Sequence, residues 1–171
     1  MTGLVPVSGS SDLARIAKVA DILQLVTFAL GNEDYAVDIL KVQEINRMKE
    51  ITRVPNSPDY VEGVINLRGK VIPVVSLRRK FGLEDRENDT QSRIMIMDIQ
   101  GITMGLIVDA VSEVLRVPAS IVEPTPPMTS NISTEFIKGI AKLEDRLIIL
   151  LDMDRLIGKS DETALLEASG M

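Results

Sequence analysis

The chain has 171 residues, of which 45% are hydrophobic and only 3% aromatic, and its formal net charge at pH 7 is −6. A chain of this length can bury a core as one domain or as two small lobes packed on each other. It contains no Cys and no His, which excludes disulfides, thiolate and imidazole metal sites, and His-activated nucleophiles.

Charge and hydropathy also restrict the partners. The basic residues are spread along an acidic chain, which disfavours binding to nucleic acid. No apolar run approaches the ~20 residues of a membrane helix, and the first residues lack the basic start and the apolar stretch of a secretion signal. We therefore expect a cytoplasmic protein without direct membrane insertion.

The first part of the chain is predicted to be rich in strands. Residues 1–21 form a predicted tail, within which 11–20 has the apolar periodicity of a short helix. The strand-like segments that follow are 23–30, 35–38 and 42–48. Residues 39–41 predict a single helical turn, and Pro55 and Pro58 then interrupt regular pairing.

A hairpin is predicted next, and a similar pattern returns later in the chain. The hairpin runs from 61–67 to 71–77, with Gly69 supplying the positive φ of a tight turn. The polar stretch 84–91 contains no apolar residue and is predicted to join two halves. The second half contains predicted strands at 93–99 and 102–108. A closing helix is expected within 159–171, where Ser160 can cap it.

The two halves contain a duplicated segment. Residues 58–82 align with 134–158 without a gap, and Tyr60 is matched by Phe136. The other matches are at glycines, apolar residues and one arginine: Gly63/Gly139, Leu67/Leu143, Ile72/Ile148, Arg79/Arg155 and Gly82/Gly158.

Many short strands with turns between them predict small barrels or a sandwich, because a parallel α/β sheet needs crossover helices. The duplication favours two barrels, at about 22–83 and 92–158, and leaves an exchange of strands between them open. Each half is too small to bury its apolar residues well alone, so we expect a shared hydrophobic interface. A groove where the lobes meet is a natural place for a partner.

Each candidate site residue also has a simpler explanation that involves no function. Asp152 and Asp154 have a spacing that can direct two carboxylates at a metal or at acid–base chemistry, but a solvated turn after a buried strand explains them better. Arg68 at the hairpin tip has the alternative of a plain loop residue. Glu44 is either a solvated carboxylate or a partner for Arg68 or for an incoming basic side chain. For Val111 and Val114 the alternative is plain core.

A comparison of the two copies favours a function for Arg68. The copies match at apolar and glycine positions, whereas the polar or turn residues of the first differ from those of the second. The differing pairs are Asn66/Lys142, Arg68/Glu144, Gly69/Asp145 and Pro73/Ile149. This pattern indicates that one copy alone contains a specialised contact.

Five ordered motifs closely resemble the bacterial chemotaxis coupling protein family CheW. They are 38–45 (DILKVQEI), 51–58 (ITRVPNSP), 63–69 (GVINLRG), 73–78 (PVVSLR) and 108–115 (VDAVSEVL). The resemblance covers about 22–158. It implies a mainly β fold of two intertwined, SH3-like five-stranded β-barrel subdomains that share a hydrophobic interface, with short helices and a C-terminal helix.

The resemblance also implies a function and partners. The family members are non-catalytic adaptors, without a cofactor, that join the cytoplasmic tip of methyl-accepting chemotaxis receptors to the regulatory domain of the histidine kinase CheA. The chain is expected to be monomeric when isolated and to enter rings within membrane-associated receptor arrays. The residues that contact the kinase are not indicated.

Carried over residue by residue, the family's receptor-facing groove falls on Ile39, Val42, Glu44, Gly63, Arg68, Val111 and Val114. Apolar members would receive side chains of a helical hairpin, and Glu44 and Arg68 would fix its register. Ser76 departs from the family, which often has Asp at this position.

Two alternatives remain at this point. Beside the coupling adaptor, the chain could be the adaptor-like module of a larger chemotaxis protein with a receiver domain. It could also be a small carboxylate-using or metal-binding β-barrel enzyme built around Asp152, Asp154 or Glu44. An adaptor would not respond to divalent ions, whereas a metal bound to the native state would raise the melting temperature.

Overall fold

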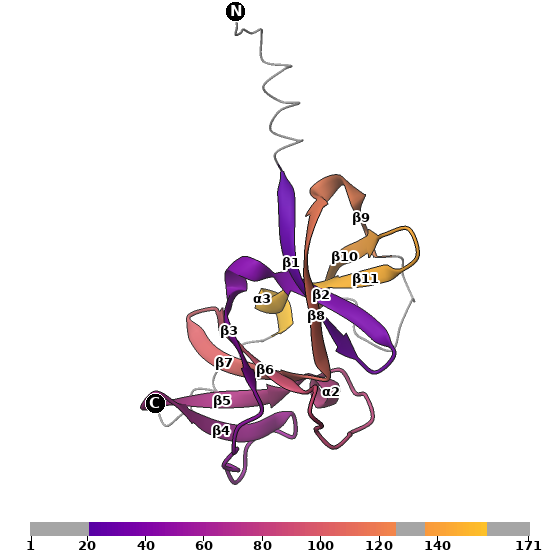
Figure 1. Cartoon of the computed structure of the whole chain (residues 1–171). Helices are drawn as coiled ribbons and strands as arrows, with labels where there is room; N and C mark the ends of the chain where they lie inside the picture. The colour runs from indigo at the N-terminus through magenta and orange to yellow at the C-terminus, as the bar shows by residue number, and fades with distance from the viewer. Residues whose placement is uncertain (1–20, 126–135, 157–171) are drawn as a thin grey trace, which may run out of the picture.

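The computed structural model describes residues 21–125 and 136–156, and within them the chain is mainly β (Figure 1). The predicted helices within 11–20 and 159–171 lie outside the described residues. Sheet A contains, in spatial order, β8 (Ala110–Pro118), β1 (Ile22–Leu30), β2 (Glu33–Asp38), β11 (Leu147–Leu151), β10 (Ile137–Lys142) and β9 (Val122–Glu123). Sheet B contains β3 (Val42–Arg47), β6 (Arg93–Ile99), β7 (Ile102–Val108), β5 (Lys70–Ser76) and β4 (Val61–Leu67). The predicted mainly β class is confirmed.

Short helical segments join or follow the strands. They are η1 (Ile39–Lys41), α2 (Leu77–Lys80), η2 (Ala119–Ile121) and α3 (Met153–Leu156). The predicted helical turn at 39–41 is η1, which begins where the Asp38 carboxylate accepts a hydrogen bond from the Leu40 amide at 2.9 Å. The predicted tight turn between β4 and β5 has positive φ at both Arg68 and Gly69, as a two-residue type I′ hairpin requires.

The duplication seen in the sequence is also present in the structure. The Ser76 amide donates to the Tyr60 carbonyl at 2.8 Å, and the Asp152 amide donates to the Phe136 carbonyl at the same distance. Each copy is an antiparallel hairpin, β4–β5 or β10–β11, followed by a four-residue helix. Ser76, where the family often has Asp, is the N-cap of α2, and its hydroxyl accepts from the Arg79 amide.

The two sheets do not follow the linear halves of the chain. The β1–β2 hairpin from the first half pairs with β8 and β11, whereas the β6–β7 hairpin from the second half pairs with β3 and β5. Each half therefore contributes its first hairpin to the sheet of the other half. The contacts of these hairpins with β5 and β11 are parallel, which local hairpin formation cannot produce.

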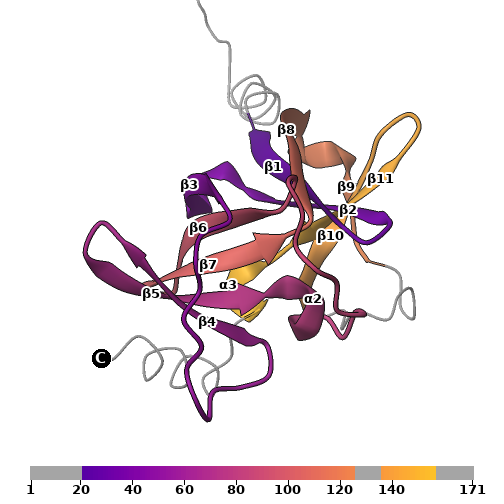
Figure 2. The ribbon, with the colours of Figure 1, turned by 60° about the horizontal axis from the view of Figure 1, so that its bottom comes forward.

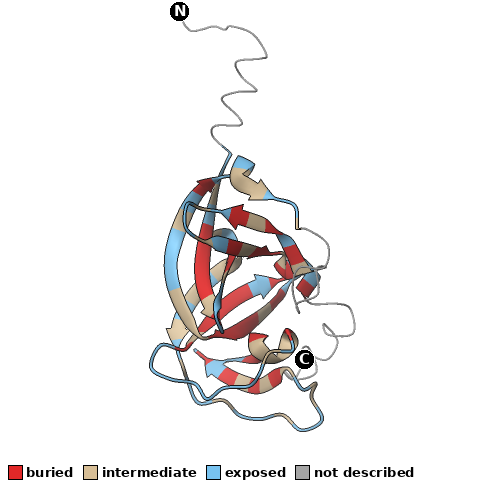
Figure 3. Ribbon diagram, turned by 90° about the vertical axis from the view of Figure 1, so that its right-hand side faces the viewer, coloured by how far each residue is buried: buried red, intermediate tan, exposed pale blue. Residues whose placement is uncertain are grey.

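Three hydrophobic clusters result from this arrangement, and the largest lies between the sheets. We call it the central core. Both sheets contribute to it, for instance Val26 and Phe28 on β1 and Met95 and Met97 on β6, all at most 2% exposed. Figure 3 shows the buried residues in red along the strands. Burying each such side chain contributes roughly 1.5–3 kcal/mol. The other two clusters lie within the single sheets, one around Ile94 and Ile96 of sheet B and one around Leu25 and Leu150 of sheet A.

A row of aromatic rings connects the two copies of the duplicated segment with the β1–β2 hairpin. Phe28, Tyr35, Phe81 and Phe136 follow one another with centroid separations of 5.7–6.1 Å. The Lys80 ammonium lies 4.2 Å from the Tyr60 ring centroid and 5.9 Å from that of Phe136, the two aromatic residues matched in the repeat. The few aromatic residues of the chain are therefore concentrated where these segments meet.

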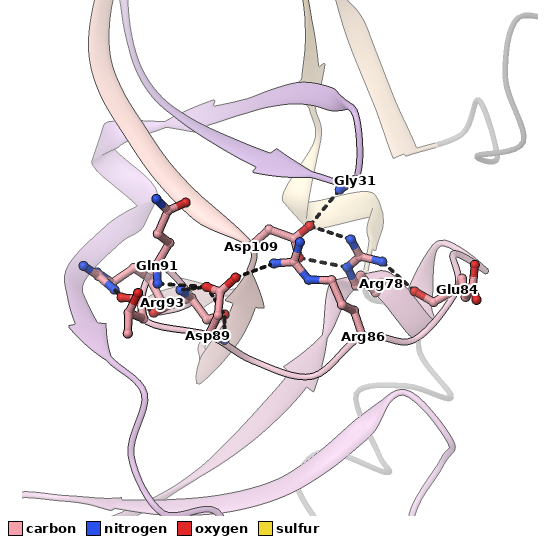
Figure 4. A network of polar contacts seen from close by, with 10 residues as sticks. Gly31, Arg78, Glu84, Arg86, Asp89, Gln91, Arg93 and Asp109 are labelled. Carbon is pink, nitrogen blue, oxygen red and sulfur yellow. Dashed lines mark hydrogen bonds and ion pairs between the residues drawn. The ribbon is translucent and has the colours of Figure 1, made fainter.

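An ion pair connects the two sheets at Asp109, the residue between β7 in sheet B and β8 in sheet A (Figure 4). Its carboxylate accepts two hydrogen bonds from Arg78 of α2, at 2.8 and 2.6 Å, and one from the amide of Gly31 in the β1–β2 turn at 2.8 Å. Arg78 also donates to the Glu84 carbonyl at 2.6 Å, and Arg86 approaches Asp109 at 3.8 Å. Asp109 therefore connects both sheets and the polar stretch that follows α2.

The pair is mostly buried, with side chains 12–14% exposed. Burial raises the pKa of Asp109, but the hydrogen bonds from Arg78 and Gly31 and the charges of Arg78 and Arg86 outweigh it, so that the pKa lies below its ordinary value. A carboxyl with a lowered folded-state pKa stabilises the fold above its unfolded pKa of about 4, and this stabilisation is lost as the pH falls through the folded-state value.

The first prediction concerns this pair. Asp109→Asn should lower the free energy of unfolding by about 3 kcal/mol at neutral pH, because it leaves the Arg78 charge buried without a partner. The difference from wild type should shrink as the pH falls below about 4, where Asp109 of the unfolded chain takes up a proton, and should be smallest below the lowered folded-state pKa. Urea denaturation across this pH range measures both, with the exposed Asp98→Asn as control. A difference that is small at neutral pH, or that does not change with pH, contradicts this account.

The second prediction concerns the matched glycines Gly63 and Gly139, which adjoin equivalent irregularities in β4 and β10. A Cβ on Gly63 would overlap the Thr52 carbonyl, and one on Gly139 would lie 2.8 Å from the Glu123 carbonyl oxygen. Both contacts are to backbone, so Gly63→Ala and Gly139→Ala should each destabilise the protein by about 1–3 kcal/mol. Thermal melting measures this, with Lys138→Ala as control, and melting temperatures equal to wild type would show that the backbone yields.

Candidate binding surface at the seam between the sheets

The predicted contact residues lie mainly on β3 and β8, the first strands in the spatial orders of the two sheets. Figure 2 shows β3 and β8 in the upper part of the view, with β1 between them. Ile39, Val42 and Val111 are partly buried against the central core, whereas Val114 is 52% exposed. We call Ile39, Val42, Val111 and Val114 the seam surface.

A β-bulge places Val111 and Val114 on one face of β8. Residues three apart in a regular strand point to opposite faces. Here Val111 lies opposite Phe28, Glu113 opposite Thr27 and Val114 opposite Val26, so that Ser112 is an extra residue. Directly opposed residues share a face, and Phe28 and Val26 both belong to the central core, so both valines face that side.

The hydroxyl of Thr27 holds the bulge in place. It donates to the Glu113 carbonyl at 2.9 Å and accepts from the Glu113 amide at 3.1 Å, while Thr27 itself is only 1% exposed. The spacing in the sequence gives no sign of this arrangement. For Val114, the alternative of plain core does not hold, because half of its side chain is accessible to solvent.

A second bulge, on β3, separates the apolar and charged candidates. Val42 lies opposite Met97 and Glu44 opposite Ile96, so that Gln43 is extra. Met97 belongs to the central core and Ile96 to the core of sheet B. Val42 therefore faces the seam, whereas Glu44 emerges on the other face of the strand.

Glu44 and Arg68 form an ion pair, as one of the predicted alternatives required. The Arg68 guanidinium donates Nη1 to Oε1 at 3.3 Å and Nη2 to Oε2 of the same carboxylate. The hydrogen bond from Arg68 lowers the pKa of Glu44, and the same bond raises the pKa of Arg68. Both groups are therefore charged at neutral pH, and Arg68 remains 71% exposed, open to a partner.

Gly63 has a different position from the other predicted contacts. It is buried in β4 with φ of +152°, and the adjacent Thr52 backbone occupies the space of any Cβ. Thr52 and Val64 exchange backbone hydrogen bonds of 2.8 and 2.9 Å beside it. Its role in the described structure is to permit this close approach.

A second Glu–Arg pair was missed in the sequence comparison. Arg146 Nη2 donates to Glu113 Oε1 at 2.6 Å, between the β10–β11 hairpin and β8. The first copy has the same kind of pair, Arg68 with Glu44. We expected a specialised contact in one copy alone, but a Glu–Arg ion pair is present at both hairpins. The alignment could not reveal it, because Arg146 is matched with Lys70 and Arg68 with Glu144.

The carboxylates of Asp152 and Asp154 have structural partners. Asp152 Oδ1 accepts from the Asp154 amide at 3.1 Å at the start of α3, and Asp154 pairs with Lys41 at 3.5 Å. Within residues 21–125 and 136–156, no group of three or more acidic, His or Cys residues is placed to hold a metal. A polar pocket of about 280 Å³ beside Arg53–Asp59 contains none of the predicted contact residues. None of the described helices is long and apolar enough to span a membrane.

Comparisons with known proteins agree with the resemblance. The family model "CheW-like domain" matches residues 24–161. The chain is 37% identical over 158 residues to "Chemotaxis protein CheW" of Klebsiella aerogenes, covering 91% of this chain and 95% of that protein. It is 33% identical over 141 residues to "Probable chemotaxis protein CheW" of Rhizobium etli, covering 82% and 91%.

A solved structure is also similar. The crystal structure of "scaffolding protein TtCheW" from Thermoanaerobacter tengcongensis matches with a TM-score of 0.75 and 42% sequence identity, over 81% of this chain and 90% of that one. The predicted pair of SH3-like subdomains is thereby confirmed. The names of these relatives are those of chemotaxis and scaffolding proteins, in agreement with the expectation that the chain is not an enzyme. The chain belongs to the CheW family of chemotaxis scaffold proteins.

Proposed function

We propose that the protein is an adaptor that couples methyl-accepting chemoreceptors to the histidine kinase CheA. It acts in the cytoplasm and is recruited to receptor arrays at the membrane. The proposal rests on the family, and on one observation in particular: apolar side chains from both sheets are partly open to solvent at the seam, and an exposed ion pair lies on the other face of β3.

The seam surface fits the apolar face of a helix from the receptor tip. Val42, Val111 and Val114 face the central core side, and a helix that covers them removes their remaining exposed area from water. Glu44 and Arg68 lie at the rim. Charged groups in that position contribute more to specificity and register than to affinity.

Signalling follows from assembly in this proposal. The receptor and the regulatory domain of the kinase bind separate surfaces of the adaptor, which raises the effective concentration of each near the other. The family resemblance implies that the regulatory domain of the kinase has the same double-barrel fold. Similar barrel ends of the adaptor and the kinase then pair with one another and form alternating rings beneath the receptors.

The direct test is a pull-down with the CheA regulatory domain and a receptor cytoplasmic fragment, separately and together. The purified protein should retain each partner alone and both at once. Failure to retain either one contradicts the proposed function. Mutually exclusive retention contradicts separate binding surfaces.

The third prediction is that Arg68→Glu weakens receptor binding by about tenfold, or about 1.4 kcal/mol. The change removes the exposed guanidinium and places a second carboxylate beside Glu44, which reverses the local charge. Titration with the receptor fragment measures the affinity. Thermal melting should change little, because exposed ion pairs contribute only about 0–1 kcal/mol to stability.

Lys138→Glu, a charge reversal at an exposed residue of β10, is the matched control. An affinity of Arg68→Glu equal to that of the control would remove Arg68 from the binding site.

A further inference from the structure

The strands β3 and β8 are equivalent residue by residue. Their bulges lie at equivalent positions. Each paired residue of β3 corresponds to a residue of β8 that lies further along the chain by the separation between Val42 and Val111, and their partners on β6 and β1 are separated by the same number of residues. Val42 lies opposite Met97 as Val111 lies opposite Phe28. This correspondence is separate from that of the duplicated hairpins, which have the larger offset from Gly63 to Gly139.

The equivalence identifies a counterpart for Val114. At the same offset Val114 corresponds to Ile45, which lies opposite Met95 as Val114 lies opposite Val26. Met95 and Val26 both belong to the central core, so Ile45 faces the seam beyond the β3 bulge, as Val114 does beyond that of β8. Both side chains are large, apolar and accessible: Ile45 is 39% and Val114 52% exposed.

The charged pairs correspond as well. Glu44 of β3 and Glu113 of β8 are related by the same offset, and each carboxylate pairs with an arginine of the hairpin in its own sheet. The arginines occupy different positions of the two hairpins, Arg68 before the turn glycine and Arg146 before β11. The ion pair therefore recurs although the residue that provides the guanidinium differs.

We propose that the receptor site consists of two equivalent half-sites, each with two apolar residues that flank a bulge on one face of the strand and a Glu–Arg pair at the rim. Ile45 and Arg146 are the contact residues that complete it. The inference rests on the proposed function. Its occupant is the helical hairpin of the receptor tip, because a hairpin has two helical arms and each of two similar half-sites can receive one arm.

The alternative is that Ile45 and Arg146 are ordinary surface residues. Single exposed apolar side chains are common and need no partner. Val71 is such a residue, 51% exposed at the start of β5 and outside the two strands of the seam. It is therefore the matched control for Ile45, and Lys138 of β10 is the control for Arg146.

The fourth prediction compares Ile45→Asn and Arg146→Glu with Val71→Asn and Lys138→Glu in titrations with a receptor cytoplasmic hairpin fragment. Each of the first two variants should bind about fivefold or more weakly, and each control within about twofold of wild type. Because all four residues are exposed or partly exposed, melting temperatures should stay close to wild type. Ile45→Thr provides a milder second variant, with an intermediate loss expected.

The outcomes separate the two proposals. If the wild-type protein does not bind the fragment, the proposed function fails and the inference fails with it. If wild type binds, while either Ile45→Asn or Arg146→Glu binds as the controls do, the two-half-site arrangement is wrong and the proposed function stands. An equal loss in the controls also contradicts the arrangement, because the effect would then be non-specific.

Discussion

The central core between the two sheets is the feature on which the rest of the structure depends. Each sheet buries one face in its own small cluster and turns the other toward the partner sheet. Because the β1–β2 and β6–β7 hairpins are exchanged, separating the two halves of the chain would break strand ladders in both sheets as well as expose this core. Halves of this size bury too little apolar surface to be stable alone, so the exchange makes the two subdomains one unit.

The same core explains where the candidate binding surface lies. The strands β3 and β8 are partly covered by the core on one face, and the bulges turn additional apolar side chains toward the seam at the point where the coverage ends. Apolar residues at the edge of a core are held on rigid strands and still reach solvent. That combination suits binding, because little conformational freedom is lost when a partner covers them.

The ion pairs divide into two kinds with different roles. Arg78–Asp109 is mostly buried, connects the sheets and is worth several kcal/mol if one partner is lost. Glu44–Arg68 and Glu113–Arg146 are more exposed and contribute little to folding. Their charges are therefore available for the recognition of partners. Substitution of these residues can change partner selection with little loss of stability.

The sequence predicted the elements well, because alternation and turn glycines are local signals, as in β4–β5 and β6–β7. It predicted the duplicated hairpin because glycines such as Gly63 and Gly139 are required by close backbone contacts. It missed the second correspondence, between β3 and β8, because the offset there differs from that of the hairpins, so that no single alignment of the halves contains both. It also could not place Val111 and Val114 on one face, since a bulge leaves no mark in the sequence.

Hydrogen exchange of the protein with and without the receptor fragment tests the account most directly. Slower exchange of the amides of both β3 and β8 is predicted on binding, and slower exchange confined to one of these strands, or found in neither, would contradict it.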